Sequence, residues 1–376
     1  MKRSTKSVSP GAVNGDGAVS LRDLAAAVGL SPTTVSLVLN QSPGSQGIPQ
    51  ETKDRIIAAA RKLKYRPNFL ARSLRAQRTY SVGVLVPELS EGYSSLVVAG
   101  IEEALMKRGY LYLATSHRHS TALVESIPRL LWERRVEGLI LVDTPYPINV
   151  PLPVVSVSGH RHDPNVTNIV LDHDEAARLG IGHLFELGHR RVAVVKGQEF
   201  SSDTEIRWQA IERAARQRGM PIDENLVVQL QGDSPSPETG YAAAQVLMKR
   251  SVPFTAVFAF NDVSAVGAIR AFQERGMRVP EAVSVVGFDD IWGAAFHIPS
   301  LTTIRQPLRE MGSLAAETLL ARIESKDANG QPGELRVVPE LIRRESTGPV
   351  REAAAAPPIP VRGSRAAARP STYLKS

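Results

Sequence analysis

Apolar residues near the start of the chain recur with the period of an α-helix. Leu21, Leu24 and Val28 stand at positions i, i+3 and i+7, and Ser20 occupies the position of an N-cap just before them. Gly29 ends this pattern, because glycine takes the left-handed backbone that follows a helix at little cost. These residues predict a first short helix.

A second helix is predicted two residues further on. Ser31 is its expected cap, and Pro32 suits its first position. Val35, Val38 and Leu39 form its buried stripe. Two short helices joined at a glycine are typical of a helix-turn-helix, whose second helix enters a DNA groove; an αα-hairpin buried in a core is the alternative. The outward residues that could meet base edges are Pro32, Thr33, Ser36 and Leu37.

A third helical pattern begins after Pro49, with Ile56, Ala60 and Leu63 on one face that would cover the first two helices. Beyond residue 80, short apolar runs alternate with longer amphipathic patterns. The runs predict strands at 82–86, 111–114, 139–142, 154–157, 169–171, 192–195, 226–230, 256–260 and 283–287. The amphipathic patterns predict helices at 96–108, 174–187, 205–218, 239–249 and 263–275.

This alternation of strands and helices predicts parallel sheets covered by helices on both faces. Nine or more strands indicate two doubly wound lobes rather than one, in agreement with a chain of 376 residues, which exceeds the size of a single core. Ligands of such sheets bind beyond the carboxyl ends of the strands, so a cleft between the two lobes is the expected ligand site.

Charge is divided unevenly along the chain. Residues 1–78 hold 13 lysines and arginines against four acidic residues, a net charge of +9, whereas the remaining 298 residues carry −2. A basic head on a mildly acidic body is typical of a protein that binds nucleic-acid phosphates. Cysteine is absent, which excludes disulfides and thiolate metal sites and fits a reducing cytoplasm. No apolar run approaches a membrane span, and the N-terminus lacks the apolar segment of a secretory signal.

The segment after the third helix carries the residues of a known family. Its pattern PNxxARxL is formed by Pro67, Asn68, Ala71, Arg72 and Leu74. The strand VGVLVP at 82–87 and the segment TTIRQP at 302–307 follow. With the helix-turn-helix before them, these motifs in this order resemble the lactose/galactose repressor family of bacterial transcription factors, over most of the chain. One departure is QSPGSQG at 41–47, a few residues longer than the family's usual loop.

The resemblance implies an all-α helix-turn-helix head and an α/β body of two lobes with doubly wound parallel sheets, like that of periplasmic binding proteins. It implies a homodimer on a near-palindromic operator in double-stranded DNA, in the cytoplasm and on the nucleoid. A small-molecule effector, a sugar or sugar derivative, is expected between the lobes, and no cofactor. The expected parts are a disordered extension at 1–17, a head at 18–66, a hinge at 67–79, a first lobe at 80–172 and 303–332, a second lobe at 173–302 and 333–348, and a disordered basic tail at 352–376.

The resemblance assigns roles to residues of the second helix. Pro32, Thr33 and Leu37 would read bases, Thr33 by hydrogen bonds and the other two through apolar surface such as that of a thymine methyl. Thr34 and Ser36, with the N-terminus of the helix, would hold phosphates.

The hinge would form a short helix only on DNA and beside its dimer mate. Leu74 would enter the minor groove as an apolar wedge, and Arg72 and Arg75 suit phosphates; packing of Leu74 against its own lobe is the alternative. The candidate DNA-binding residues are thus Pro32, Thr33, Thr34, Ser36, Leu37, Asn40, Asn68, Ala71, Arg72, Leu74 and Arg75.

Six residues are assigned to the effector cleft by the same resemblance. Arg207 would grip ligand hydroxyls or carboxylates, and Asp289 and Asn261 would add polar contacts. These groups, with an aromatic ring, suit a polyhydroxy ligand such as a sugar. Ser158 stands where relatives often carry aspartate, and a lobe-stabilising role is the alternative for the others. The set is Tyr93, Ser94, Ser158, Arg207, Asn261 and Asp289.

Other classes of function have less support. The pairs His117/His119 and His160/His162 have a spacing that a metal site could use, but each encloses an arginine and no cysteine is present, so they are interpreted as solvated loop histidines and no metal is expected. A sugar-metabolising enzyme lacks a phosphate loop and a catalytic motif. An exported sugar-binding protein would share the lobes, but the basic head and the missing signal disfavour it.

Overall fold

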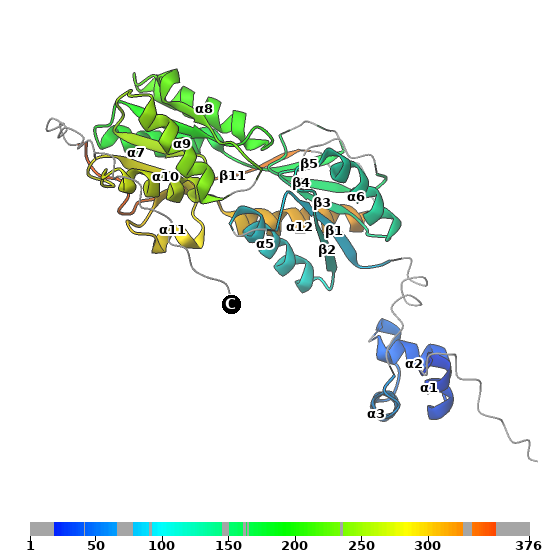
Figure 1. Ribbon diagram of the computed structural model, residues 1–376. Coiled ribbons are helices and arrows are strands. Elements are labelled where there is room, and N and C mark those ends of the chain that lie inside the picture. The colour runs from blue at the N-terminus through cyan, green and yellow to red at the C-terminus, as the bar shows by residue number, and fades with distance from the viewer. Residues whose placement is uncertain are drawn as a thin grey trace, which may run out of the picture. The chain divides into compact units, whose positions relative to one another are not determined.

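The computed structural model describes residues 19–40, 42–65, 78–89, 92–144, 150–160, 163, 165–233, 236–325 and 333–350. The chain divides into two units, Met1–Thr79 and Tyr80–Ser376, which we call the head and the body (Figure 1). No helix in the described part of the chain is both long and apolar enough to pass through a bilayer. The expected disordered ends and the hinge positions lie outside the described residues, the latter being Asn68, Ala71, Arg72, Leu74 and Arg75.

The head consists of α1 (Leu21–Val28), α2 (Pro32–Leu39) and α3 (Gln50–Lys62). Ser20 closes a capping box on α1: its Oγ accepts a hydrogen bond from the Asp23 N–H at 3.2 Å, and the Asp23 carboxylate accepts one from the Ser20 N–H at 2.9 Å. Gly29 has φ 68°, the left-handed C-cap that the sequence predicts. The apolar stripes meet in one core, which contains Leu24, Ala25, Val35, Val38 and Ile56.

The first lobe of the body is a six-stranded parallel sheet in the order β11–β5–β4–β3–β1–β2. Successive residues of β1 point to opposite faces, so Val84 packs into the core under α5 and α12, and Leu85 into the core under α6 (Figure 1). The elements are β1 (Ser81–Val86), α5 (Tyr93–Lys107), β2 (Leu111–Ser116), α6 (Thr121–Glu133), β3 (Leu139–Val142), β4 (Val154–Val157), β5 (Val166–Leu171), α12 (Leu308–Ser325) and β11 (Glu334–Val337).

The second lobe repeats this plan in the order β12–β10–β9–β8–β6–β7. Val194 of β6 belongs to the core that α7 and α8 cover, and Val195 to the core under α9 and α10. The predicted parallel pairing holds except at the edge, where β12 runs antiparallel to β10. The elements are α7 (His173–Glu186), β6 (Val192–Lys196), α8 (Asp203–Gln217), the 3-10 turn η2 (Glu224–Leu226), β7 (Val227–Gln229), α9 (Pro237–Lys249), β8 (Ala256–Ala259), α10 (Asp262–Glu274), β9 (Ser284–Asp289), α11 (Trp292–Phe296), β10 (Thr302–Arg305) and β12 (Glu340–Ile342).

The chain passes between the two sheets after β5, after β10 and between β11 and β12. The expectation that the first lobe regains the chain at residue 303 is wrong, because β10 still pairs with β9 in the second sheet. The expectation that residues 333–348 lie wholly in the second lobe is also wrong, because β11 pairs with β5. Gln306 therefore lies where the chain leaves the second sheet for the first lobe.

Candidate nucleic-acid interface and interlobe cleft

Helix α2 presents a short outward face at its N-terminal end. Pro32 and Thr33 are exposed, and Leu37 is partly exposed. Ser31 caps the helix by accepting a hydrogen bond from the Thr34 N–H at 3.1 Å, as its sequence position predicts. This end of α2 therefore offers a helix N-terminus, a hydroxyl and apolar surface, the groups that contact phosphates and base edges.

Three of the candidate DNA-binding side chains on α2 and at its C-cap already make hydrogen bonds within the head. Thr34 Oγ1 lies 2.8 Å from Ser31 Oγ. Asn40 donates from Nδ2 to the Ser36 carbonyl at 2.8 Å and to Ser36 Oγ at 3.1 Å. These groups cap the two ends of α2, so Thr33 carries the more accessible hydroxyl of this face.

The longer loop after α2 borders the same face. It forms the 3-10 turn η1 (Pro43–Ser45), and a Cβ placed on Gly44 would lie 3.4 Å from Leu37 Cδ2. The added residues therefore pack beside Leu37, so the loop partly shields the side chain expected to contact a base.

A cleft opens between the lobes at the carboxyl ends of both sheets, where the sequence predicts the ligand site. The empty space between its walls is ≈ 750 Å³ when the open solvent at its mouth is included. The candidate effector residues that line it are Tyr93, Ser94, Arg207, Asn261 and Asp289. Ser158 does not line the cleft: its Oγ lies 2.6 Å from the Tyr93 hydroxyl and positions that ring.

Arg207 of α8 is held by the protein itself. Its Nη1 donates to the Phe260 carbonyl at 2.6 Å, and its Nη2 donates to Asp203 Oδ2 at 3.0 Å. The guanidinium carbon lies 3.7 Å from the centre of the Phe288 ring. Its buried Nε has no hydrogen-bond partner among the described residues. A bidentate grip on a ligand carboxylate would therefore cost the pairing with Asp203.

Two buried carboxylates of the cleft differ in their electrostatic state. Burial alone would raise the pKa of Asp203, but the nearby His173, hydrogen bonds from two histidines and the charge of Arg207 hold this pKa well below its ordinary value. Burial raises the pKa of Asp289 to about 7, although Arg207 and a hydrogen bond from Gln306 oppose the rise. The cleft therefore contains one firmly ionised carboxylate and one that changes charge near neutral pH.

Three strands end at the cleft in a backbone conformation that favours glycine. Asp143 follows β3 with φ 39°, Ser158 follows β4 with φ 56°, and Asp289 ends β9 with φ 108°. Such conformations cost about 1–3 kcal/mol each and collect at functional sites, where they direct side chains that a regular strand would aim elsewhere. Their occurrence at the carboxyl ends of strands from both sheets supports the interlobe cleft as the ligand site.

Polar contacts also join the lobes across the cleft. Asp143 of the first lobe accepts hydrogen bonds from the N–H and Oγ of Ser202 at 3.0 and 2.7 Å, and from Ser201 Oγ at 3.2 Å. His160, which follows β4, lies with its Nε2 2.6 Å from Oδ1 of Asp203 in the second lobe. A ligand that rearranges these contacts would change the angle between the lobes.

The interpretation of the H-x-H histidines as solvated is wrong for the three that the structure describes, His117, His119 and His160. His117 is 1% exposed, and the His119 ring stacks on Phe200 with their centroids 3.6 Å apart in the cleft wall. The His160 side chain is 13% exposed and paired with Asp203. His162 lies outside the described residues. The error arises because an arginine beside a histidine says little about which way the histidine points.

Sequence reasoning missed several residues of the cleft. Asp143 stands directly after the predicted strand 139–142, and this position could have selected it. Asp203 carries no local signal, because as the first residue of α8 it resembles any acidic residue at a helix start. Gln306 belongs to the motif TTIRQP, and this position could have selected it. The other missed lining residues include Glu88, His119, Gln198, Phe200, Ser201 and Phe260.

Two family models match the chain. Residues 20–68 match the model described as bacterial regulatory proteins, lacI family, and residues 181–347 match the periplasmic binding protein-like domain. The first match covers the helix-turn-helix, and the second covers most of the second lobe and the strands that follow it.

Relatives extend the similarity over both units. The chain is 33% identical to the HTH-type transcriptional repressor PurR of Yersinia pestis bv. Antiqua (strain Antiqua) over 346 residues, 88% of this chain and 98% of the relative. It is 31% identical to PurR of Haemophilus influenzae over 338 residues, 87% of this chain and 98% of the relative.

Solved structures agree with this similarity. The lac repressor dimer bound to operator and the anti-inducer ONPF matches with a TM-score of 0.75 and 26% identity, covering 88% of this chain and 99% of that one. The transcriptional regulator CelR in complex with cellobiose matches with a TM-score of 0.65 and 30% identity, covering 87% and 99%. Because these relatives include the head, an exported sugar-binding protein is not favoured. The chain belongs to the lacI family of bacterial regulatory proteins.

Proposed function

We propose that the protein is a transcriptional repressor that binds a near-palindromic operator as a homodimer and responds to an uncharged sugar-like effector in the interlobe cleft. The observation that carries the DNA part is the exposed N-terminal face of α2, on a head whose basic residues outnumber its acidic ones. The protein would act in the cytoplasm on chromosomal DNA, and it would bind and release its effector without chemical change.

Each head would read one half of the operator. Pro32, Thr33 and Leu37 are the side chains on the outward face, and their surface is more apolar than that of an arginine or glutamine. A methyl-rich half-site with thymines opposite Pro32 and Leu37 fits this face. Leu74, which lies outside the described residues, would enter the minor groove at the operator centre together with its dimer mate.

The charges of the cleft favour an uncharged effector. Its described lining contains the carboxyl groups of Glu88, Asp143, Asp203 and Asp289 against the guanidinium of Arg207. A phosphorylated or carboxylated ligand would meet this acidic excess, whereas sugar hydroxyls can donate to the carboxylates and the rings of Tyr93 and Phe200 offer apolar surface. Two related regulators have been solved with cellobiose and with ribose bound.

The effector would couple to DNA through the angle between the lobes. Tyr93, Ser94 and Asp143 belong to the first lobe, whereas Arg207 and Asn261 belong to the second, so one ligand can contact both. A ligand can shift the population of DNA-competent dimers only if it binds the conformation with one lobe angle more tightly than the conformation with another. A coupling free energy of about 1–3 kcal/mol is typical of such systems.

Selection from a random duplex pool with the full-length protein tests the DNA part. We expect enrichment of a near-palindromic sequence, bound with an affinity that falls steeply with added salt because phosphate contacts release counterions. Enrichment of no sequence, or of one half-site at a ratio of one chain per duplex, would contradict the proposal.

Thermal unfolding with a ligand panel tests the effector part. The panel contains ribose, cellobiose and glucose, with glucose 6-phosphate as the charged counterpart. A ligand at a hundredfold excess over its Kd adds about 2.7 kcal/mol of stability, so a true effector raises the unfolding temperature clearly. Stabilisation by glucose 6-phosphate alone would show that the effector is anionic and would contradict the charge argument.

A further inference from the structure

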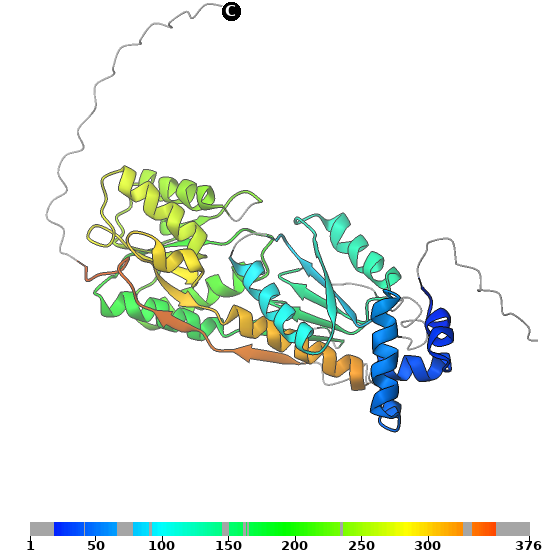
Figure 2. The same cartoon turned by 90° about the horizontal axis from the view of Figure 1, so that it is seen from below.

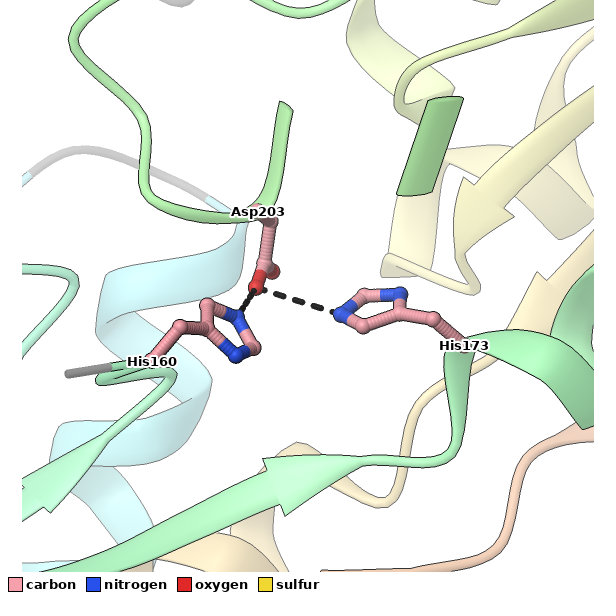
Figure 3. A group of neighbouring side chains, drawn as sticks. All are labelled: His160, His173 and Asp203. Carbon is pink, nitrogen blue, oxygen red and sulfur yellow. Dashed lines mark hydrogen bonds and ion pairs between the residues drawn. The ribbon is translucent and has the colours of Figure 1, made fainter. Parts of the chain in front are cut away.

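Two histidines and an aspartate converge at the junction of the lobes, next to the effector cleft (Figure 3). The Nε2 atoms of His160 and His173 lie 2.6 and 3.2 Å from the same oxygen, Oδ1 of Asp203. The three ligand atoms lie within 4.8 Å of one another. His160 belongs to the first lobe, whereas His173 begins α7 and Asp203 begins α8 in the second.

From this arrangement we infer that His160, His173 and Asp203 form a site for a divalent transition metal, of which Zn²⁺ is the best fit, and that the ion would join the two lobes. Two imidazole nitrogens and one carboxylate oxygen are donors that Zn²⁺ prefers, and three protein ligands with one open position are typical of its non-structural sites. Asp203 lines the cleft, so the open position would face solvent or ligand there.

The two separations of the histidine nitrogens from the Asp203 oxygen are close to what the ion requires. Ligand atoms of tetrahedral Zn²⁺, each about 2.0–2.2 Å from the metal, lie roughly 3.3 Å apart. The separation of His173 Nε2 from Asp203 Oδ1 already matches this value, and His160 would withdraw by about 0.7 Å. Each ring would bind as a neutral imidazole through Nε2, with its proton on Nδ1, so the ion replaces the two hydrogen bonds to Oδ1.

The second oxygen of Asp203 is held in a way that suits a metal ligand. Oδ2 accepts a hydrogen bond from Arg207 Nη2 at 3.0 Å, and the Arg207 guanidinium is fixed on the Phe288 ring. This support orients the carboxylate and leaves Oδ1 for the ion, as partners of ligating carboxylates do in metal sites. The ion would also offset the acidic character of the cleft lining, in which carboxyl groups outnumber guanidinium groups.

Cobalt titration of the full-length protein, made without a histidine tag and freed of metals with a chelator, tests this inference. Co²⁺ should bind at one equivalent per chain with the visible absorption of a tetrahedral site, and Zn²⁺ should displace it. His160→Gln and His173→Gln should each weaken binding at least about tenfold. His297→Gln should not, because His297 contacts the Pro299 carbonyl outside the cleft.

X-ray absorption of the Zn²⁺-loaded parent protein provides a measurement that needs no variant. Two imidazoles and one or two further oxygen ligands are the expected shell. Absence of saturable Co²⁺ binding, equal binding by parent and both glutamine variants, or a zinc shell without two imidazoles would each overturn the inference. None of these outcomes decides the proposed function, because operator selection and sugar binding are measured separately from metal binding.

Discussion

Gln306 donates a hydrogen bond from Nε2 to Oδ1 of Asp289 over 2.6 Å. Gln306 lies where the chain leaves the second sheet for the first lobe, and Asp289 lies on the wall of the effector cleft. Both side chains are buried. The charge of a cleft residue is therefore linked directly to one of the segments that connect the lobes.

The raised pKa of Asp289 predicts a pH-dependent stability. Because the folded pKa of about 7 exceeds the ordinary value of 3.8, the folded state holds this proton more tightly than the unfolded state. The protonated Asp289 side chain therefore contributes to the free energy of unfolding in full below about pH 4. This contribution, of the order of 4 kcal/mol, is lost as the pH rises to 7. Asp289→Asn removes the charge, so the variant should gain stability over the parent across this window.

Urea unfolding followed by tryptophan fluorescence measures this difference, because all three tryptophans, Trp132, Trp208 and Trp292, lie in the body. Burial lowers the pKa of His117 to about 4, so its contribution to stability falls as the pH falls, opposite to that of Asp289. Because this titration is present in both proteins, it cancels in the difference between variant and parent. A difference that is constant between pH 4 and 8 would show that Asp289 has an ordinary pKa.

Close helix packing in the first lobe predicts a strict requirement for glycine. Helices α5 and α12 lie side by side (Figure 2), and a Cβ on Gly100 would collide with the Arg309 carbonyl. Gly100→Ala should therefore force the helices apart and cost about 3 kcal/mol, which lowers the melting temperature by roughly 5–10 °C. Gly293→Ala in α11 is the control, because no atom lies within 4 Å of its added Cβ. Equal melting temperatures for the two variants would refute this account.

Much of the fold could be predicted because apolar runs mark buried parallel strands. β3 reads LILV and is buried throughout, so its pattern is unambiguous. β11, which reads ELRV, is exposed at three of its four residues, so no burial pattern marks it. Its place in the first sheet depends on pairing with β5, a contact more than 160 residues away in sequence. Helix α6 is absent from the helices predicted from the sequence, and Pro128 inside it is a residue that normally interrupts a helix.

The cleft residues that the sequence predicts correctly are those that a family motif places. Arg207 and Asp289 belong to recognisable segments, and both line the cleft. His160, His173 and Asp203 come from three separate segments, and each by itself resembles a loop or helix-start residue. Their meeting depends on the closure of one lobe on the other, which no local pattern encodes.

Removal of the exposed Thr33 hydroxyl on α2 should lower the affinity for the operator without lowering the stability of the head. Thr33→Ala removes one hydrogen bond to DNA and should weaken binding to the selected operator about fivefold. The slope of affinity against salt should stay the same, because threonine is uncharged. Thr121→Ala, at an exposed position of the body, is the matched control. Fluorescence anisotropy at several salt concentrations measures both quantities, and equal affinities of the two variants would remove Thr33 from the interface.

A substitution at Asn261 should weaken ligand binding without lowering the stability of the body. Its Oδ1 caps α10 by accepting a hydrogen bond from the Ser264 N–H at 2.8 Å, and the residue lines the cleft. Serine is an equally good cap but lacks the amide, so Asn261→Ser should keep the melting temperature while weakening the best sugar of the panel about tenfold. Asn261→Ala loses both the cap, at about 1 kcal/mol, and the ligand contact. Calorimetric titration with thermal unfolding distinguishes the two roles: if Asn261→Ser binds the sugar as the parent does, Asn261 serves α10 alone.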